Sequence, residues 1–197
     1  MHAYATNSHR LRVAITLAAV AVPITLAIDT VASGSWLYSV SYPAVLAGLL
    51  AWFDRYGWRM PWIRALHQPT PIVAGTYEGR LKSQWREHTD DPWINVDKRI
   101  RIEIDQRWTD LRLDFTVLGE RTSTAYSTSA RLHDVGNGRA ELLYTFHNDP
   151  ERPAADPDMK PHAGTAALTL HDDGSVNGTY YNARLREGTM TLRRTSR

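Results

Sequence analysis

Arg184 is the side chain in this sequence that is best placed to bind an anion, because it follows the adjacent aromatic residues Tyr180 and Tyr181. Its guanidinium group presents two parallel N–H donors, which match the oxygens of a phosphate or a carboxylate. Tyr180 would add a flat aromatic surface next to the charge. The same arginine would serve equally well in a structural ion pair on the protein surface, and the sequence leaves both interpretations open.

Hydroxyl groups gather in one short stretch, at Thr122, Ser123, Ser127 and Ser129. On a strand of a closed barrel, these side chains could line a polar interior. On an exposed edge strand, Ser and Thr would merely satisfy the β propensity of the segment, and the sequence slightly favours this second arrangement.

Three further side chains could contact a ligand. Trp108 and Tyr144 could stack on a flat ring, although aromatic residues at strand ends usually belong to the core, and this is what we expect of Trp108. His162 lies beside Gly164 at the end of a Pro- and Asp-rich stretch. We expect it to hold this loop through a hydrogen bond, with contact to a ligand as the alternative.

Catalytic and metal-binding patterns are missing from the sequence. It contains no cysteine, which excludes disulfides, thiolate catalysis and Cys-based zinc sites. The eight histidines show no His-x-x-x-His spacing. A Gly-x-Ser-x-Gly motif, a P-loop and a Rossmann fingerprint are also absent. We therefore expect a protein that is not an enzyme and needs no cofactor or metal.

The elements that would position these residues are strands, because apolar and polar residues alternate after Pro71. Ile100, Ile102 and Ile104 alternate with charged residues, and later segments repeat the pattern. Turns are expected at Asn137-Gly138, Asp172-Asp173-Gly174 and Glu187-Gly188. No segment with a helical period could cover the sheet, so the sequence predicts an all-β fold, a small antiparallel barrel of about eight strands over residues 69–197.

The first 68 residues have a different character, since Val13–Ile28 and Thr30–Phe53 are almost free of charge apart from Asp29 between them. Two such runs predict an N-terminal transmembrane hairpin over residues 1–68, with the second span centred on Trp36–Phe53. Arginines flank the hairpin on its two outer sides, which places both termini in the cytoplasm. An alternative is that the first run is a cleaved signal peptide ending near Val31-Ala32-Ser33.

Charge argues against one class of partner. After Gln68 the chain holds 18 basic and 19 acidic residues, whereas the whole chain has a formal net charge of +2. Affinity for long nucleic acids comes mainly from many Lys and Arg contacts with phosphates, so a nearly neutral domain is a poor candidate for that role. A small ligand bound by a few well-placed groups remains possible.

An ordered set of short motifs behind the apolar hairpin resembles a known family. These motifs are Gly75-Thr-Tyr77-Glu-Gly79, Ile104-Asp-Gln106-Arg-Trp108, the run from Thr122 to Ser129, Leu143-Tyr144-Thr-Phe146-His-Asn148-Asp-Pro150, His162-Ala-Gly164, Gly178-Thr-Tyr180-Tyr181-Asn-Ala-Arg184 and Gly188-Thr-Met190-Thr-Leu192. The chain resembles the two-transmembrane, β-strand-rich (S-2TMβ) CD-NTase-associated effectors of bacterial CBASS antiphage systems. The likeness covers nearly the whole chain, although none of the motifs is specific by itself.

The resemblance implies a function. Members of that family bind a cyclic dinucleotide in the barrel, oligomerise through the membrane helices and disrupt the inner membrane, which causes abortive infection. A ligand of this kind requires a cation for its phosphates, aromatic faces for its bases and hydroxyl groups for the base edges. The candidate ligand-binding residues are then Arg184, Tyr180, Thr122, Ser123, Ser127, Trp108, Tyr144 and His162.

Two other classes of function stay open. A membrane-anchored, lipocalin-like carrier or a scaffold subunit would use the same barrel, and a carrier would require an apolar interior instead of hydroxyls and arginine. An enzyme on a barrel scaffold has only scattered His and Asp residues in its favour.

Overall fold

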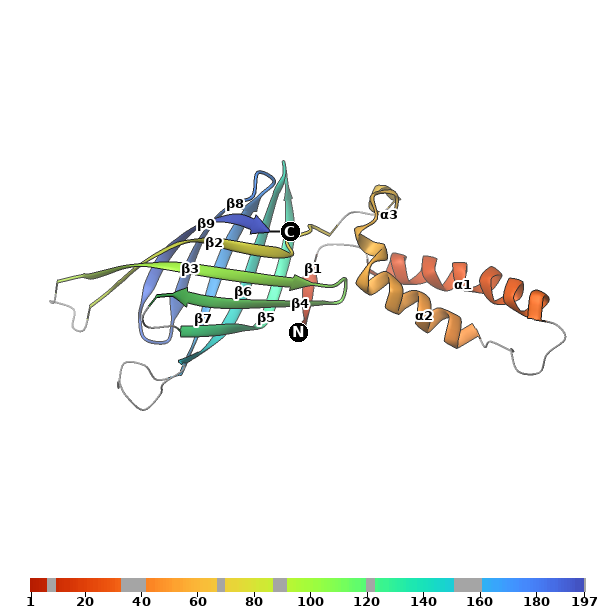
Figure 1. Ribbon diagram of the computed structural model, residues 1–197, viewed down its shortest axis with the longest axis horizontal. Coiled ribbons are helices and arrows are strands. Elements are labelled where there is room, and N and C mark those ends of the chain that lie inside the picture. Colours follow the sequence, from red (N-terminus) through yellow and green to blue (C-terminus); the bar gives the residue numbers. More distant parts are fainter. Residues whose placement is uncertain are drawn as a thin grey trace. The chain divides into compact units, whose positions relative to one another are not determined.

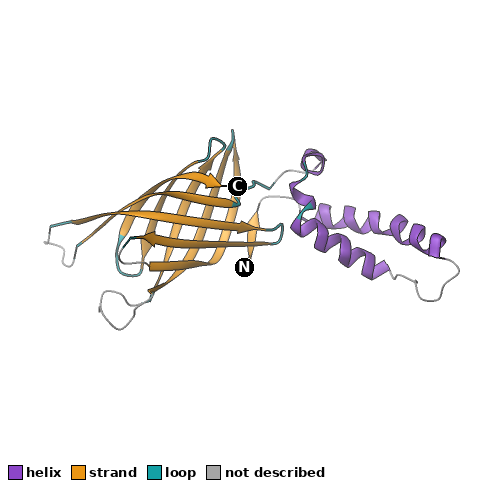
Figure 2. Cartoon of the chain, viewed as in Figure 1, coloured by secondary structure: helices purple, strands orange, loops and turns teal. Residues whose placement is uncertain are grey.

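The computed structural model describes seven stretches of the chain, residues 1–6, 10–32, 42–66, 70–86, 92–119, 123–150 and 161–196. The chain forms two compact units. One is Ser8–Thr70 and consists of helices; the other joins Met1–Asn7 to Pro71–Arg197 and consists of strands (Figures 1 and 2). The first residues, expected in the hairpin domain of residues 1–68, lie in the strand unit by this division.

The helical unit contains α1 (Arg10–Ala32), α2 (Tyr42–Arg55), a short 3₁₀ helix (Gly57–Arg59) and α3 (Pro61–Leu66). Helices α1 and α2 pack against each other. The hydroxyl of Tyr42 on α2 donates a hydrogen bond of 3.1 Å to the carbonyl of Ala18 on α1. Such close contact is possible because small side chains lie along the facing helix.

One helix among the described residues is long and apolar enough to cross a membrane, by length and composition alone. It covers Arg10–Thr30, with a mean hydropathy of 2.2. Two spans were expected. The 14 residues of α2 correspond to about 21 Å of helix, less than a hydrocarbon core of about 30 Å. The first part of the expected second span, including Trp36 and Tyr38, lies outside the described residues.

The strand unit contains nine strands, where about eight were expected. They are β1 (His2–Thr6), β2 (Gly75–Trp85), β3 (Ile94–Gln106), β4 (Asp110–Leu118), β5 (Ser123–Gly136), β6 (Arg139–Pro150), β7 (His162–His171), β8 (Ser175–Asn182) and β9 (Glu187–Ser196). The unexpected strand is β1, which precedes the apolar hairpin in the sequence. With five residues and Tyr4 as its only large side chain, it shows too little alternation to be recognised.

The nine strands form a closed barrel in the order β1-β4-β3-β2-β9-β8-β7-β6-β5, with an additional direct pairing of β4 with β5. From β2 to β9 every strand pairs antiparallel with its neighbours. β1 pairs antiparallel with β4 but parallel with β5. Closure leaves no long row of unpaired backbone groups at a sheet edge.

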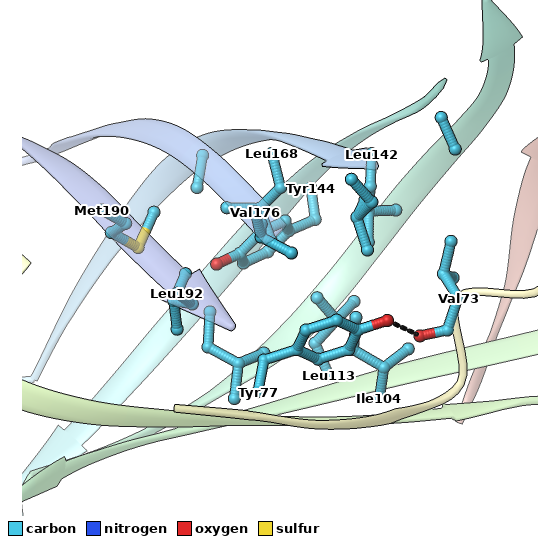
Figure 3. Close-up of a cluster of buried hydrophobic side chains, with 14 of the residues drawn as sticks. Val73, Tyr77, Ile104, Leu113, Leu142, Tyr144, Leu168, Val176, Met190 and Leu192 are labelled. Carbon is cyan, nitrogen blue, oxygen red and sulfur yellow. Dashed lines mark hydrogen bonds between the residues drawn. The ribbon is translucent and has the colours of Figure 1, made fainter. Parts of the chain in front are cut away.

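The predicted alternation is confirmed in the barrel core. Ile100, Ile102 and Ile104 on β3 are 0%, 1% and 5% exposed, whereas the residues between them point outward. Figure 3 shows how aliphatic side chains from several strands meet inside the barrel around Tyr77 and Tyr144. Burial of this apolar surface, at about 25 cal/mol per Å², is the main force that holds the closed sheet together.

Two of the three predicted turns are confirmed by positive φ angles. Asn137 and Gly138 have φ of 53° and 69°, and Gly174 has φ of 82°. The third prediction is wrong, because Gly188 lies within β9 and the chain reverses before it. A Cβ atom at Gly188 would collide with the ring of Tyr180 and the carbonyl of Lys82, so this glycine permits close packing instead of a turn.

Candidate functional site

The topology gathers alternate strand connections at one end of the barrel. In an antiparallel meander, the links β2–β3, β4–β5, β6–β7 and β8–β9 share one end, and the links β3–β4, β5–β6 and β7–β8 share the other. A cavity of about 230 Å³ lies inside the barrel, lined mainly by residues near the first set of links. We call this end the cavity end and the other the closed end.

Six of the eight predicted site residues line this cavity. They are Ser123, Ser127, Tyr144, His162, Tyr180 and Arg184. They come from four different strands and one turn, so the sequence motifs that carried the prediction converge in space although they are spread over about 60 positions.

The two other predicted residues have different outcomes. Trp108 lies in the β3–β4 link at the closed end, where it is 9% exposed, and it does not line the cavity. Its burial agrees with the expectation that Trp108 belongs to the core, and its position at the opposite end of the barrel separates it from this cavity. Thr122 lies outside the described residues.

The turn between β8 and β9 presents two arginines to the cavity, Arg184 and Arg186. Asn182 holds the turn, since its Oδ1 accepts hydrogen bonds from the backbone N–H groups of both arginines, at 3.0 and 3.1 Å. Leu185 between them has a φ of 56°, which is unfavourable for a leucine, and its side chain is 90% exposed. The strained turn therefore fixes the backbone positions from which the side chains of Arg184 and Arg186 extend.

Aromatic contact positions the second cation. The guanidinium of Arg186 lies over the ring of Trp85, 4.7 Å from the ring centre, which is a cation–π distance. Lys98 on β3 also lines the cavity, so three cationic residues do so, and no Asp or Glu is among the described lining residues. Because the domain as a whole is nearly neutral, this arrangement gives the cavity a local preference for anions.

His162 connects the strands around the cavity. Its Nε2 atom lies 3.4 Å from the side-chain amide nitrogen of Asn148 on β6 and 3.3 Å from that of Asn182 on β8. Residues 151–160 lie outside the described residues, so the predicted role of His162 in holding this loop stays a prediction. Through Asn182, His162 also supports the turn that carries Arg184.

Tyr180 reaches across the cavity. Its hydroxyl donates a 2.6 Å hydrogen bond to Ser83 Oγ on β2, and burial raises the pKa of this hydroxyl, an effect that Ser83 and Arg186 partly oppose. The ring can lie this close to β9 because residue 188 is glycine. Tyr180 is thus a rigid wall residue with an aromatic face.

The hydroxyl-rich segment lies on β5, and a β-bulge decides which of its residues face inward. Ser123 and Ser127 line the cavity, and Ser123 donates a 2.7 Å hydrogen bond to Asn148 Oδ1. Period two would also turn Ser129 inward, but the register shift between Ser127 and Ser129 leaves Ser129 exposed, where it bonds to Thr145. The expectation of an exposed edge strand is wrong, because β5 has hydrogen-bonded neighbours on both sides.

Tyr144 is the most deeply buried polar side chain of the cavity wall, 6% exposed. Its hydroxyl has no hydrogen-bond partner among the described residues, and burial raises its pKa above the ordinary value. This hydroxyl is not fully enclosed by protein atoms, so a ligand with a polar edge in the cavity could form a hydrogen bond with it.

Several lining residues were missed by the sequence analysis, among them Ser83, Trp85, Asn182 and Arg186. A signal for two of them existed, because Ser83 and Trp85 continue the inward face of β2 from Tyr77 with period two. Arg186 carried no such signal, since its place depends on a turn at residues 183–185 that was predicted later, at Glu187-Gly188.

Fold and site together define a class, a closed β-barrel that receives a small anionic ligand at one end through cations, hydroxyls and aromatic faces. Among the described residues, no group of His, Asp or Glu could hold a metal ion.

Comparison with known proteins agrees with this class and identifies the family within it. Residues 68–194 match the family described as "Cap15, cyclic dinucleotide receptor domain", and the chain belongs to this family. It is also 25% identical over 160 residues to CD-NTase-associated protein 15 of Yersinia aleksiciae, which covers 79% of this chain and 70% of that protein. The predicted relationship to the S-2TMβ effectors of CBASS systems is confirmed.

Proposed function

We propose that the cavity binds a cyclic dinucleotide and that this binding activates the protein as a membrane-disrupting effector of antiphage defence. The observation that carries the proposal is the charge of the cavity. Lys98, Arg184 and Arg186 line it, and no Asp or Glu is among the described lining residues, in a domain that is nearly neutral as a whole. Two phosphodiester groups in one small ring are a ligand that such a cavity suits.

The remaining groups match the other parts of such a ligand. The wall below the arginines is largely apolar and includes Phe115, Phe146 and Met190, which can cover the faces of bases. Tyr144, Ser127 and Asn148 supply polar atoms for base edges. Mostly apolar walls with a few fixed polar groups are typical of small-ligand sites, and the proposed role is binding without catalysis.

The effector step would use the helical unit. In this proposal α1 and the segment through α2 both span the inner membrane, with both termini in the cytoplasm, as the flanking arginines favour. Small side chains along α1, including Ala14, Ala18 and Ala21, permit close helix packing and hence oligomerisation when ligand is bound. The resulting membrane damage would end growth of the infected cell before phage release.

Dye release from vesicles tests this proposal. Full-length protein is reconstituted into phosphatidylethanolamine–phosphatidylglycerol vesicles, and cyclic UMP-AMP, cyclic di-GMP and related cyclic dinucleotides are added in turn. We expect leakage with one of them and none without ligand. Arg184→Ala should suppress leakage, whereas Arg139→Ala, at the closed end, should not. Binding without leakage under these conditions would contradict the effector step and leave receptor function intact.

The apolar part of the cavity wall is the one observation that favours a membrane-anchored carrier. A carrier would bind a fatty acid or lipid in preference to a cyclic dinucleotide. The test is to bind a fluorescent fatty acid to the protein and then add cyclic dinucleotides. Binding of the fatty acid without displacement by any cyclic dinucleotide would support that alternative.

A further inference from the structure

The N-terminal strand β1 lies between β4 and β5 where these two strands are no longer paired with each other. β4 and β5 pair directly only over Asp114–Val117 and Ser123–Tyr126, and toward the closed end the two strands separate. Residues His2–Thr6 occupy the gap, pairing with β4 at Leu111 and then with β5 at Ala130–Leu132. Without β1 both strands would expose unpaired backbone groups along this gap, each of which costs free energy when buried.

The inward side chains of β1 belong to the barrel core. Tyr4 is 3% exposed, and its hydroxyl donates to the carbonyl of Arg107 at 3.3 Å. It also accepts a 3.3 Å hydrogen bond from the amide nitrogen of Gln106. The same amide group binds the backbone of Pro71 and Val73, at 2.9 Å each, where the chain re-enters the barrel. Tyr4 thus joins β1 to the hydrogen-bond network at the point where the chain re-enters the barrel.

His2 connects β1 to the cavity wall. Its Nε2 lies 2.8 Å from Oγ of Ser127, a 7% exposed residue that lines the cavity. Its Nδ1 lies 3.3 Å from the carbonyl of Ala3, which favours the tautomer with the proton on Nδ1 and leaves Nε2 as an acceptor. Ser127 then donates to His2 and accepts the N–H of Leu113 at 2.9 Å, which retains one acceptor position.

We propose that β1 is part of the ligand receptor, and that His2 is a positioning residue that fixes Ser127 Oγ so that its remaining acceptor position faces the bound ligand. The inference rests on the proposed function. It extends the receptor beyond residues 68–194, the segment that the family shares, to a strand that lies on the other side of the helices in the sequence. Residues 7–9 join this strand to α1, so the segment that completes the receptor leads directly into the candidate membrane span.

A double-mutant cycle tests the role of His2. Full-length protein in detergent micelles is titrated with cyclic UMP-AMP and with cyclic di-GMP, in the wild type and in the variants His2→Ala, Ser127→Ala and the pair. We expect each single change to weaken binding by about 2- to 10-fold, the range of one hydrogen bond. The pair should be no weaker than Ser127→Ala alone. His2→Gln should restore most of the affinity, because its amide reaches the same hydroxyl, and His171→Ala at the closed end serves as the control.

Additive losses in the cycle, or unchanged affinity in His2→Ala, would overturn the positioning role. Hydrogen exchange of the unliganded protein tests the strand itself. We expect slow exchange for the amides of β1 and for Leu113, with Leu113 exchanging faster in Ser127→Ala. Fast exchange across β1 in the wild type would overturn its place in the receptor. Because this readout needs no ligand, it separates failure of the inference from failure of the proposed function.

Discussion

Replacing Tyr144 with phenylalanine should change ligand affinity and stability in opposite directions. The change removes one oxygen from the cavity wall and leaves the ring in place. This hydroxyl belongs to a side chain that is 6% exposed and has no hydrogen-bond partner among the described residues. Removing it should leave the free energy of unfolding unchanged or raise it by up to about 1 kcal/mol, which is about 2–4 °C in Tm for a chain of this size.

A ligand that bonds to this hydroxyl would lose about 0.5–1.5 kcal/mol of binding free energy, so Kd should rise about 2- to 13-fold. Isothermal titration calorimetry of the full chain in micelles measures the affinity, and thermal unfolding by circular dichroism measures the stability. The matched control is Tyr77→Phe. Tyr77 is 3% exposed and its hydroxyl donates a 2.8 Å hydrogen bond to the carbonyl of Val73 (Figure 3).

Tyr77→Phe should lower Tm by several degrees, because the buried carbonyl of Val73 loses its hydrogen-bond donor. Its ligand affinity should be unchanged, because neither Tyr77 nor Val73 lines the cavity. If Tyr144→Phe lowered Tm like the control, the hydroxyl would have a structural partner and our description of the cavity would be wrong. If its affinity equalled that of the wild type, the ligand would not touch this hydroxyl.

Three further changes have expected outcomes. Arg184→Ala should weaken binding of the cyclic dinucleotide about 10- to 100-fold by calorimetry, and Arg139→Ala should not change it, because only the former meets the ligand phosphates. Gln106→Leu should lower the free energy of unfolding by about 2–4 kcal/mol in a urea titration, because it strips buried backbone groups of their partners, and an unchanged midpoint would contradict those hydrogen bonds. High pH should destabilise the barrel: burial raises three tyrosine pKa values above 10.0, so the unfolded chain loses these protons first, and stability is intact below about pH 10 and falls above it. Tyr144→Phe should lessen that fall in Tm, whereas an equal fall in the variant would exclude Tyr144 as a contributor. The three tyrosines are Tyr77, Tyr144 and Tyr180.

Much of the barrel could be predicted from local sequence. The alternation around Ile102 fixes one inward face per strand, and Asn137-Gly138 has the conformation that a tight hairpin requires. β1 could not be predicted in the same way. Its partners lie more than a hundred positions away, and its pairing with β5 is parallel, so no turn signal joins the two strands.

The part of the candidate site that lies on strands could be predicted, because alternate residues of a strand face the barrel interior. Ser123 and Ser127 face inward because they share the inward face of β5. Trp108 was a poor candidate for a geometric reason, since its link is at the closed end. Arg186 was missed because the turn before β9 has a leucine, Leu185, at a positive φ angle where Gly or Asn is typical. Asn182 begins this turn as an Asx turn, a signal that the prediction did not use.

The unit boundary shows a similar limit. Hydropathy separates the helices from the strands near Pro71 but cannot show that Met1–Asn7 joins the later strands. That assignment depends on the burial of Tyr4 and on the hydrogen bonds of Gln106, which are tertiary contacts.

Calorimetric titration of the full-length protein with a panel of cyclic dinucleotides tests the central claim most directly. The account predicts saturable binding of at least one of them, weakened by Arg184→Ala and unaffected by Arg139→Ala. Absence of binding across the panel, or equal affinity in both variants, would contradict it.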